Sequence, residues 1–306
     1  MLLAQEGAPL DDDQIAQRLG ANRHYVNAVC RRLADSGRLI RERGSAGKLV
    51  NFARGARPPI PRPVPDSSPG VRRRLSTTGA MHLPELTVEE MEANLKRYLA
   101  DREDIARYAS FDYCFNYFRS FYADGRLSEL AAAGHVQLSC LQLGFYLASW
   151  GMFRGRSQLL QRSVKHYVPV LQAIAGADKR LWELDVDGYD DDAIGVILSG
   201  AHEIREAFPH PARDVLVTKI MLGVFGCVPA FDRYFKDGFG AQTFGAKALR
   251  RIGAFYETRG AVIDRYRVPT IDFNSGGDSA IRYTAAKVID MIFFIEGMKR
   301  GVTLGE

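Results

Sequence analysis

The pattern of hydrophobic and polar positions changes character at about residue 86. After that point apolar residues recur every three or four positions almost to the end of the chain, which is typical of packed helices. No alternating strand pattern of useful length interrupts them, so residues 86–306 are predicted to form an all-α domain. The helical stretches expected there are residues 87–122, 127–133, 137–152, 157–175, 190–207, 212–225, 230–236, 244–265 and 280–300.

The first 53 residues have a different pattern, two short helices followed by a basic hairpin. Helices are expected over residues 11–20 and 22–36, and two strands over residues 38–54, turning around Gly44–Gly47. This order resembles a winged helix-turn-helix domain, in which the start of the second helix contacts base edges. On that ground the DNA-binding residues expected are Arg23, His24 and Asn27 on the helix, and Arg41, Arg43 and Lys48 on the wing.

Charge is distributed unevenly between these parts. Residues 1–80 hold 14 Lys and Arg against 7 Asp and Glu, a net charge of +7, whereas the remaining residues hold 27 against 29, a net charge of −2. Residues 54–85 are predicted to be a linker, since residues 58–69 hold six of the 13 prolines and Arg72, Arg73 and Arg74 follow. A polyanion such as double-stranded DNA is one partner for this basic region; a protein-binding winged helix with a solvated tether is the other interpretation.

Composition narrows the remaining classes of function. Of the 306 residues, 46% are hydrophobic and 25% are charged, and no apolar run reaches the roughly 18 residues that a membrane span needs. No signal peptide precedes the first helix, and the four cysteines stand far apart without a CxxC pair, so a cytoplasmic protein without a metal or other cofactor is expected. Nucleotide-binding, zinc-protease and serine-hydrolase motifs are absent from the sequence. The acidic stretch DVDGYDDD, residues 185–192, lacks the calcium-loop glutamate and is expected to cap a helix near Asp191.

An aromatic helix is expected over residues 111–122, FDYCFNYFRSFY, with Asp112 and Asn116 forming a polar edge. Aromatic side chains on nearly every face of a helix are suited to a binding pocket in which they stack on a flipped-out nucleobase. The carboxylate and the amide would then form hydrogen bonds with the edge of that base. A buried core helix with two solvent-facing polar residues explains the same pattern. The pocket residues that this helix would contribute are Asp112, Tyr113, Asn116 and Tyr117.

Residues 218–235, TKIMLGVFGCVPAFDRYF, contain an apolar helix that ends at Phe-Gly, a proline-containing turn, and a helix that starts at Asp232. The stretch is similar to the end of the helix-hairpin-helix DNA glycosylase signature. Two further segments, residues 141–174 and 185–208, look like earlier helices of that family and occur in the family's order. The resemblance covers about 95 residues and implies an all-α glycosylase-like domain.

What the resemblance implies about the site centres on Asp232, the position that matches the family's catalytic aspartate. A carboxylate there would stabilise the positive charge that develops on the sugar when the bond to the base breaks, and a capping role alone explains the same residue. Across from it, Trp150 and Phe153 would contact an extruded base, while Arg154 and Arg156 reach phosphates.

This sequence also departs from the family's pattern. The glycine-rich hairpin is replaced by FPHPARDVLV, residues 208–217, so Arg213 or the winged helix would bind the phosphate instead. The Schiff-base lysine of bifunctional members would fall near Val215; Lys219, one turn later, is expected to be a structural or pocket residue. The four-cysteine cluster is absent as well. The resemblance therefore implies a monofunctional enzyme that leaves an abasic site.

Together these features predict a DNA glycosylase that removes a modified base, and the unusually aromatic walls suit a bulky one. By analogy with genome-defence systems, hypermodified phage bases are one such substrate. The alternative is a transcription regulator, with a winged helix for DNA and a non-enzymatic helical domain for an effector or for dimerisation. A helical nuclease or toxin is a third class, for which the sequence offers no acidic metal-binding cluster.

Overall fold

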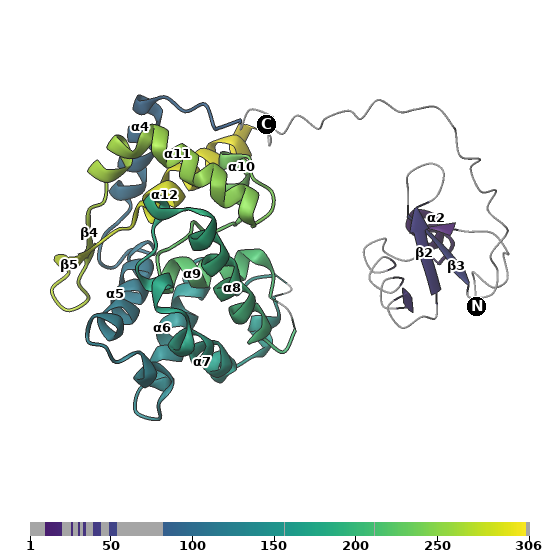
Figure 1. Cartoon of the computed structure of the whole chain (residues 1–306), viewed down its shortest axis with the longest axis horizontal. Coiled ribbons are helices and arrows are strands. Elements are labelled where there is room, and N and C mark those ends of the chain that lie inside the picture. Colours follow the sequence, from purple (N-terminus) through teal and green to yellow (C-terminus); the bar gives the residue numbers. More distant parts are fainter. Residues whose placement is uncertain are drawn as a thin grey trace. The chain divides into compact units, whose positions relative to one another are not determined.

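The computed structural model describes residues 10–19, 26, 30, 33–34, 39–43, 49–53, 82–155, 157–210 and 212–303. These residues are mainly helical, as the sequence predicts. The chain divides into two compact units, Met1–Ser76 and Thr77–Glu306 (Figure 1). None of the helices in the described ranges combines the length and the apolar character that crossing a bilayer requires.

The first unit contains a small antiparallel sheet with the strand order β1-β3-β2. Strands β2 (Leu39–Arg43) and β3 (Leu49–Ala53) form the hairpin predicted for residues 38–54. Strand β1 (Leu10–Asp11) pairs with β3 and leads into helix α2 (Asp12–Leu19). A small apolar core in this unit consists of Leu10 from β1, Ile15 and Ala16 from α2, and Val26 and Cys30.

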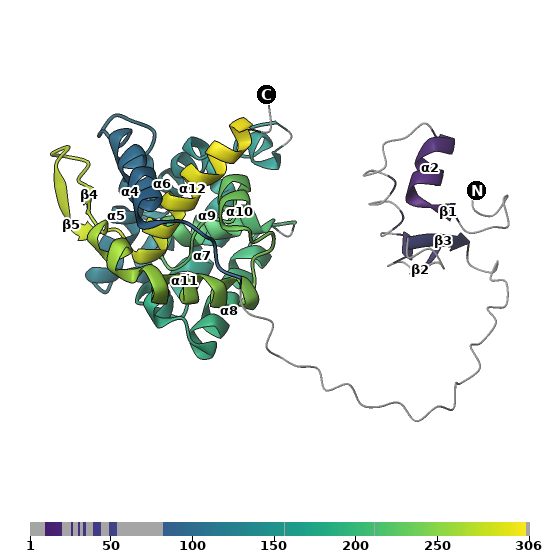
Figure 2. The same ribbon diagram turned by 90° about the horizontal axis from the view of Figure 1, so that it is seen from above.

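The second unit is a body of helices around one continuous apolar core (Figures 1 and 2). Its α-helices are α4 (Val88–Ala100), α5 (Ala109–Ala123), α6 (Val136–Ser149), α7 (Val168–Gly176), α8 (Asp191–Glu206), α9 (Asp214–Val224), α10 (Arg233–Phe239), α11 (Ala246–Arg265) and α12 (Ala285–Thr303). Five short 3-10 helices connect them in the described part: η1 (Leu127–Ala131), η2 (Gln158–Gln161), η3 (Val164–Tyr167), η4 (Lys179–Trp182) and η5 (Val186–Gly188).

Local capping explains where several of these helices begin. The Thr87 hydroxyl accepts from the Glu90 backbone N–H at 3.2 Å and the Glu90 carboxylate accepts from the Thr87 backbone N–H at 2.9 Å, so the two residues form a capping box at the start of α4. Asp190 caps α8 by accepting from the Ala193 backbone N–H at 2.7 Å, in agreement with the capping role predicted for the acidic stretch. The expected helix over residues 87–122 is interrupted, however, between α4 and α5.

A two-stranded hairpin corrects the all-α prediction for this unit. Strands β4 (Pro269–Ile271) and β5 (Asp278–Arg282) pair antiparallel and project from the helices at one edge in both views (Figures 1 and 2). Strand β5 includes positions 280–282, which were expected to be helical. These strands are only three and five residues long, too short for an alternating pattern to stand out beside helical neighbours.

Helices α10 and α12 cross at unusually short range because glycines meet at the contact. A Cβ atom built on Gly297 would lie 1.9 Å from the Tyr234 carbonyl oxygen, and one built on Gly238 would lie 2.3 Å from the Phe293 carbonyl oxygen. No other residue type fits either position without moving backbone. The close crossing places Tyr234, at the start of α10, against Gly297 of α12. The turn before α10 reaches an earlier part of α12, where the Ala230 N–H donates to Asp290.

Candidate functional site

Asp232 is both a helix cap and one half of an ion pair. Its Oδ1 atom accepts from the Phe235 backbone N–H at 3.0 Å and so caps α10, as one of the two interpretations of the sequence predicts. Its Oδ2 atom lies 2.9 Å from Nζ of Lys219, which comes from α9. The two side chains are 15% and 4% exposed, so the pair is largely withdrawn from water. A cap needs only one carboxylate oxygen; the second is committed to a lysine.

A second pair lies beside the first. Lys287 and Asp290 are neighbours on α12, with 3.2 Å between Nζ and Oδ2 and side chains 1% and 8% exposed. Nζ of Lys287 also donates to the Tyr98 hydroxyl at 3.0 Å, and Oδ1 of Asp290 accepts from the Ala230 backbone N–H at 3.0 Å. Burial lowers the pKa of Lys287, against the opposing effect of Asp290. Burial likewise raises the pKa of Asp290, and the Lys287 ammonium counteracts it.

Trp150 covers these charges with its ring. It ends α6 and stacks on Tyr108 with ring centroids 5.3 Å apart, and Tyr108 stacks on Tyr98 at 4.4 Å. The ammonium groups of Lys219 and Lys287 lie 5.4 and 5.1 Å from the Trp150 ring centroid, within the range of cation–π attraction. The buried Nε1 atom of Trp150 has no hydrogen-bond partner among the described residues. This corner therefore offers a hydrogen-bond donor that the described part of the chain does not use.

The cavity enclosed by these groups is small. It is lined by Tyr146, Trp150, Lys219, Leu222, Ala230, Asp232, Lys287, Asp290 and Phe294, and its volume is about 10 Å³. That is room for about one water molecule. A larger group can therefore enter only if the side chains around Trp150 move apart.

A much larger basic cleft adjoins this corner. Its volume is about 490 Å³, and residues 151–166 and 208–216 line it with three arginines and two histidines: Arg154, Arg162, Arg213, His166 and His210. No described residue that lines it is acidic, and none of the three arginines forms an ion pair within the described ranges. Burial lowers the pKa of His166, and Arg162 lowers it further. Such a concentration of uncompensated arginine charge attracts anions.

The cleft and the Lys219–Asp232 pair share two structural elements. Val215 and Leu216 of α9 line the cleft, and Lys219 follows them by four and three residues, so the three side chains lie along one face of the helix. At the corner after α6, Trp150 lines the small cavity and the next residue, Gly151, lines the cleft. The arrangement juxtaposes a carboxylate–lysine pair, an aromatic ring and an anion-binding surface.

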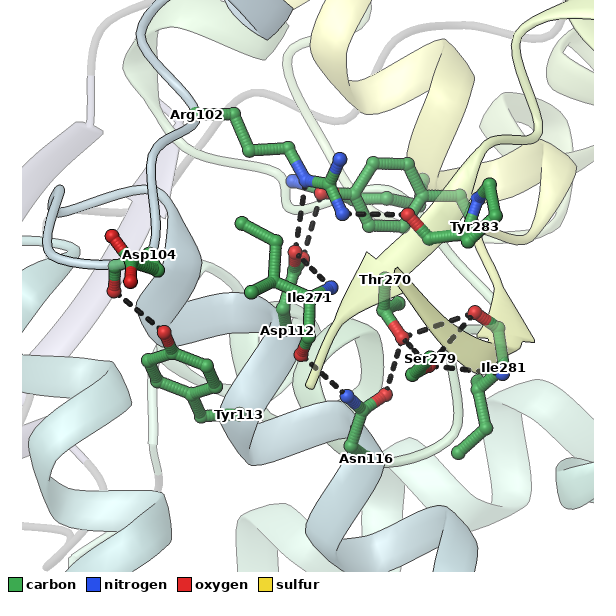
Figure 3. Close-up of polar contacts among 12 residues, drawn as sticks. Arg102, Asp104, Asp112, Tyr113, Asn116, Thr270, Ile271, Ser279, Ile281 and Tyr283 are labelled. Atoms are coloured by element: carbon green, nitrogen blue, oxygen red, sulfur yellow. Dashed lines mark hydrogen bonds and ion pairs between the residues drawn. The ribbon is translucent and has the colours of Figure 1, made fainter. Parts of the chain in front are cut away.

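The structure does not bring Asp112 and Asn116 to this place. Asp112 is fully buried and accepts from Nε of Arg102 at 2.9 Å, from the Ile271 backbone N–H at 2.9 Å and from the Tyr283 hydroxyl at 2.7 Å (Figure 3). Asn116 donates to the Ile271 carbonyl oxygen at 2.9 Å. Both side chains therefore hold the β4–β5 hairpin against α5, and neither lines the cavity at Asp232.

The other aromatic residues expected in the pocket also lie elsewhere. Tyr113 donates to the Asp104 carbonyl oxygen at 2.5 Å, and Tyr117 hydrogen-bonds the Ser139 hydroxyl at 2.8 Å. Phe153 is partly buried against the core and does not line the small cavity. The fully or largely buried phenylalanines of α5 belong to the core as well, as the core-helix interpretation expects. They are Phe111, Phe115, Phe118 and Phe121. The core-helix interpretation was wrong, however, in placing Asp112 at the solvent, because its side chain is buried.

Among the residues expected to bind DNA, Arg154 and Arg213 meet in the basic cleft although 59 positions separate them. Arg41 is 8% exposed and pairs with Asp12, so its guanidinium joins β2 to α2 and has little surface to offer to a phosphate. The expected residues outside the described ranges are Arg23, His24, Asn27, Lys48, Arg72, Arg73, Arg74 and Arg156; of Arg43 only the backbone is described.

Several residues of the site were not predicted. Lys287 and Asp290 interrupt an otherwise apolar helix, AAKVIDMIFFI, three residues apart, and that interruption was the available signal. Arg162, His166 and His210 give no sequence signal, because only the fold brings them together. Within the described ranges, no three His, Cys, Asp or Glu side chains cluster as metal ligands would.

Comparison with known protein families, with curated proteins and with solved structures gave no match.

The contacts of Asp112 predict a structural role that can be measured. Asp112→Ala leaves the Arg102 guanidinium without its carboxylate and frees β4, and we expect a loss of about 3–5 kcal/mol in the free energy of unfolding, measured by urea titration. Asp124→Ala is the control, since that carboxylate is 58% exposed and its ion pair is 3.5 Å long; a change below about 0.5 kcal/mol is expected. Equal stability of the two variants would contradict the anchoring role of Asp112.

Proposed function

We propose that this protein is a DNA glycosylase that hydrolyses the bond between a modified base and its deoxyribose and leaves the strand intact. The observation that carries the proposal is the position of the Asp232 carboxylate, which is bound by Lys219 and by the backbone of α10. The Lys219 ammonium contacts the Trp150 ring, and Lys219 lies one helical turn from residues that line the basic cleft. The order of segments that resembles helix-hairpin-helix glycosylases supports it. The proposed fold is accordingly a divergent member of that superfamily, preceded by a winged helix-turn-helix domain.

The chemistry requires a negative charge fixed near C1′ of the sugar. As the base leaves with the bonding electrons, positive charge develops on the sugar ring, and Asp232 stabilises it electrostatically while orienting the water that adds to C1′. The water gives up one proton and the departing base takes one up, so the products are the free base and an abasic sugar. Lys219 balances the charge of Asp232 in the unliganded protein.

The basic cleft supplies the binding energy for the DNA backbone. Arg154, Arg162 and Arg213 are exposed and suited to phosphate oxygens, which they contact in a sequence-independent way. Trp150 lines the cavity with the buried charges, and the next residue, Gly151, lines the cleft. The Trp150 ring is therefore the side chain that would leave Tyr108 for an extruded base to enter. Its Nε1 donor, which has no partner among the described residues, is then available to an acceptor on that base.

In the first unit, the β2–β3 hairpin and the excess of basic residues support a winged helix-turn-helix domain that adds affinity for duplex DNA. A bulky, hypermodified phage base remains the substrate class we propose, by analogy with genome-defence systems. In the stack, Tyr98 and Tyr108 are buried, and Trp150 is the ring that is partly exposed and open to contact.

The first test separates catalysis by Asp232 from its structural roles. Asp232→Asn alone would leave the Lys219 ammonium buried without its counter-charge and cost about 3–5 kcal/mol of stability. The double variant Asp232→Asn/Lys219→Met removes both charges, and asparagine still caps α10, so we expect near-wild-type melting. Base release, measured as alkali-sensitive abasic sites on a panel of modified duplexes, is expected to fall by about 10²–10³.

Lys219→Met is the matched control, because it retains the Asp232 carboxylate and its capping bond. It leaves that carboxylate without its counter-charge, so base release is measured well below the melting temperature of this variant. We expect this variant to release the base measurably faster than the double variant. If the double variant releases base at the wild-type rate, Asp232 is not catalytic and serves only as a helix cap and ion-pair partner. A wild-type protein that binds duplex DNA but releases no base from any substrate would favour the transcription regulator.

The second test concerns the basic cleft. Arg154→Gln and Arg213→Gln each remove one potential phosphate contact, so duplex affinity is expected to fall and the slope of log K against log salt to flatten by roughly 0.9 for each phosphate no longer neutralised. Fluorescence anisotropy at several salt concentrations measures both quantities. Arg126→Gln, a surface residue paired with Glu129 and outside the cleft, is the control and is expected to bind like the wild type. Unchanged slopes for both cleft variants would show that DNA binds to another surface of the protein.

A further inference from the structure

Helix α6 is apolar on the side that faces away from the core. Its inner side contributes buried residues such as Leu143, Tyr146 and Leu147. On the outer side Leu138 is 48% exposed, Leu141 45% and Phe145 68%, and Ala148 is exposed too. We call these four residues the outer face of α6. A helix with apolar residues on both sides is typical of one that is packed on both sides.

The outer face has the spacing of a helix–helix seam. Its residues follow one another at intervals of three, four and three positions, the repeat by which one helix packs against another. This spacing is also symmetric about position 143. A second copy of α6 running antiparallel therefore matches it, with Leu141 opposite Phe145 of the other copy and Leu138 opposite Ala148. The smallest of the four side chains then faces a leucine.

Charge also suits contact with a second copy. None of the 14 residues of α6 is charged, so two such helices can approach without burying an ion. At the rim, Asp104 and Arg107 are both exposed and carry opposite charges. Both line a groove of about 520 Å³ together with Leu141, Phe145 and other residues. In a two-fold dimer the rim of each copy therefore presents both a carboxylate and a guanidinium to the same rim of the other copy, which suits a self-complementary interface.

Two further exposed apolar residues extend the surface. Phe273, from the turn of the β4–β5 hairpin, is 71% exposed and also lines the groove, and Ile105 is 90% exposed beside it. Contiguous exposed apolar surface of this kind marks interaction sites on folded proteins. We propose that the outer face of α6 forms a two-fold homodimer interface in which the α6 helices of two copies pack antiparallel. The inference is independent of the glycosylase proposal.

Sedimentation equilibrium of the full chain, at concentrations up to roughly 100 µM, tests the proposal. The wild type is expected to have twice the 34.1 kDa mass of one chain. Phe145→Glu places a charge in the seam and is expected to give monomers. Leu160→Glu is the matched control, because Leu160 is 47% exposed but lies outside the groove, and it is expected to remain dimeric. A monomeric wild type, or a dimeric Phe145→Glu, would overturn the proposal.

Disulfide formation tests the antiparallel register. Leu138→Cys/Ala148→Cys places two thiols about 15 Å apart along one helix, too far to bond within a chain. Oxidation is therefore expected to link two copies, whereas Leu138→Cys alone is expected to stay unlinked. The four native cysteines are buried and give a low background. Linkage through Leu138→Cys alone would show a parallel arrangement and contradict the proposed register.

Discussion

Two lysines and two aspartates are buried side by side in the helical unit, and their charges must balance there. Each residue would be costly to bury alone, because the interior stabilises an isolated charge far less than water does. Lys219 comes from α9, Asp232 from the start of α10, and Lys287 and Asp290 from α12. The neutral set of four therefore holds three helices in register and defines the corner at which Trp150 lies.

The backbone around these four residues is likewise fixed by hydrogen bonds from neighbouring helices. The Ala230 N–H donates to Asp290, and the Phe231 N–H donates to the Thr218 hydroxyl at 2.8 Å, so the turn before α10 is held from two helices. The glycine contacts between α10 and α12 allow the close approach that this geometry needs. The cavity is closed, so a group larger than a water molecule can enter only if the side chains around it move apart.

Much of the fold was predictable, because the period of apolar residues and the capping residues both indicate helices. Thr87, Asp190 and Asp232 cap helices where the sequence indicates. The β4–β5 hairpin was missed because its strands are short and its anchors, Asp112 and Asn116, are distant in sequence and were interpreted as pocket residues. The Lys219–Asp232 pair and the basic cleft depend on tertiary packing. The sequence therefore indicates some of their residues individually but not that these residues lie together.

A glycosylase function makes use of features that a purely structural role leaves unexplained. A cap and an ion pair account for Asp232. They do not require, however, a cleft with three arginines that form no ion pair within the described ranges, lined by residues of α9 one turn before Lys219. Binding and chemistry would then share one corner of the molecule, with the basic cleft receiving the backbone and the buried carboxylate receiving the sugar.

Direct detection of the free base is decisive for the proposed function. Duplexes that contain bulky modified bases are incubated with the wild-type protein, and both the released small molecules and the DNA are analysed by mass spectrometry. We expect a free modified base in amounts equal to the abasic sites, in strands of unchanged length. Intact DNA with every base retained, under conditions in which the protein binds it, would contradict the glycosylase function.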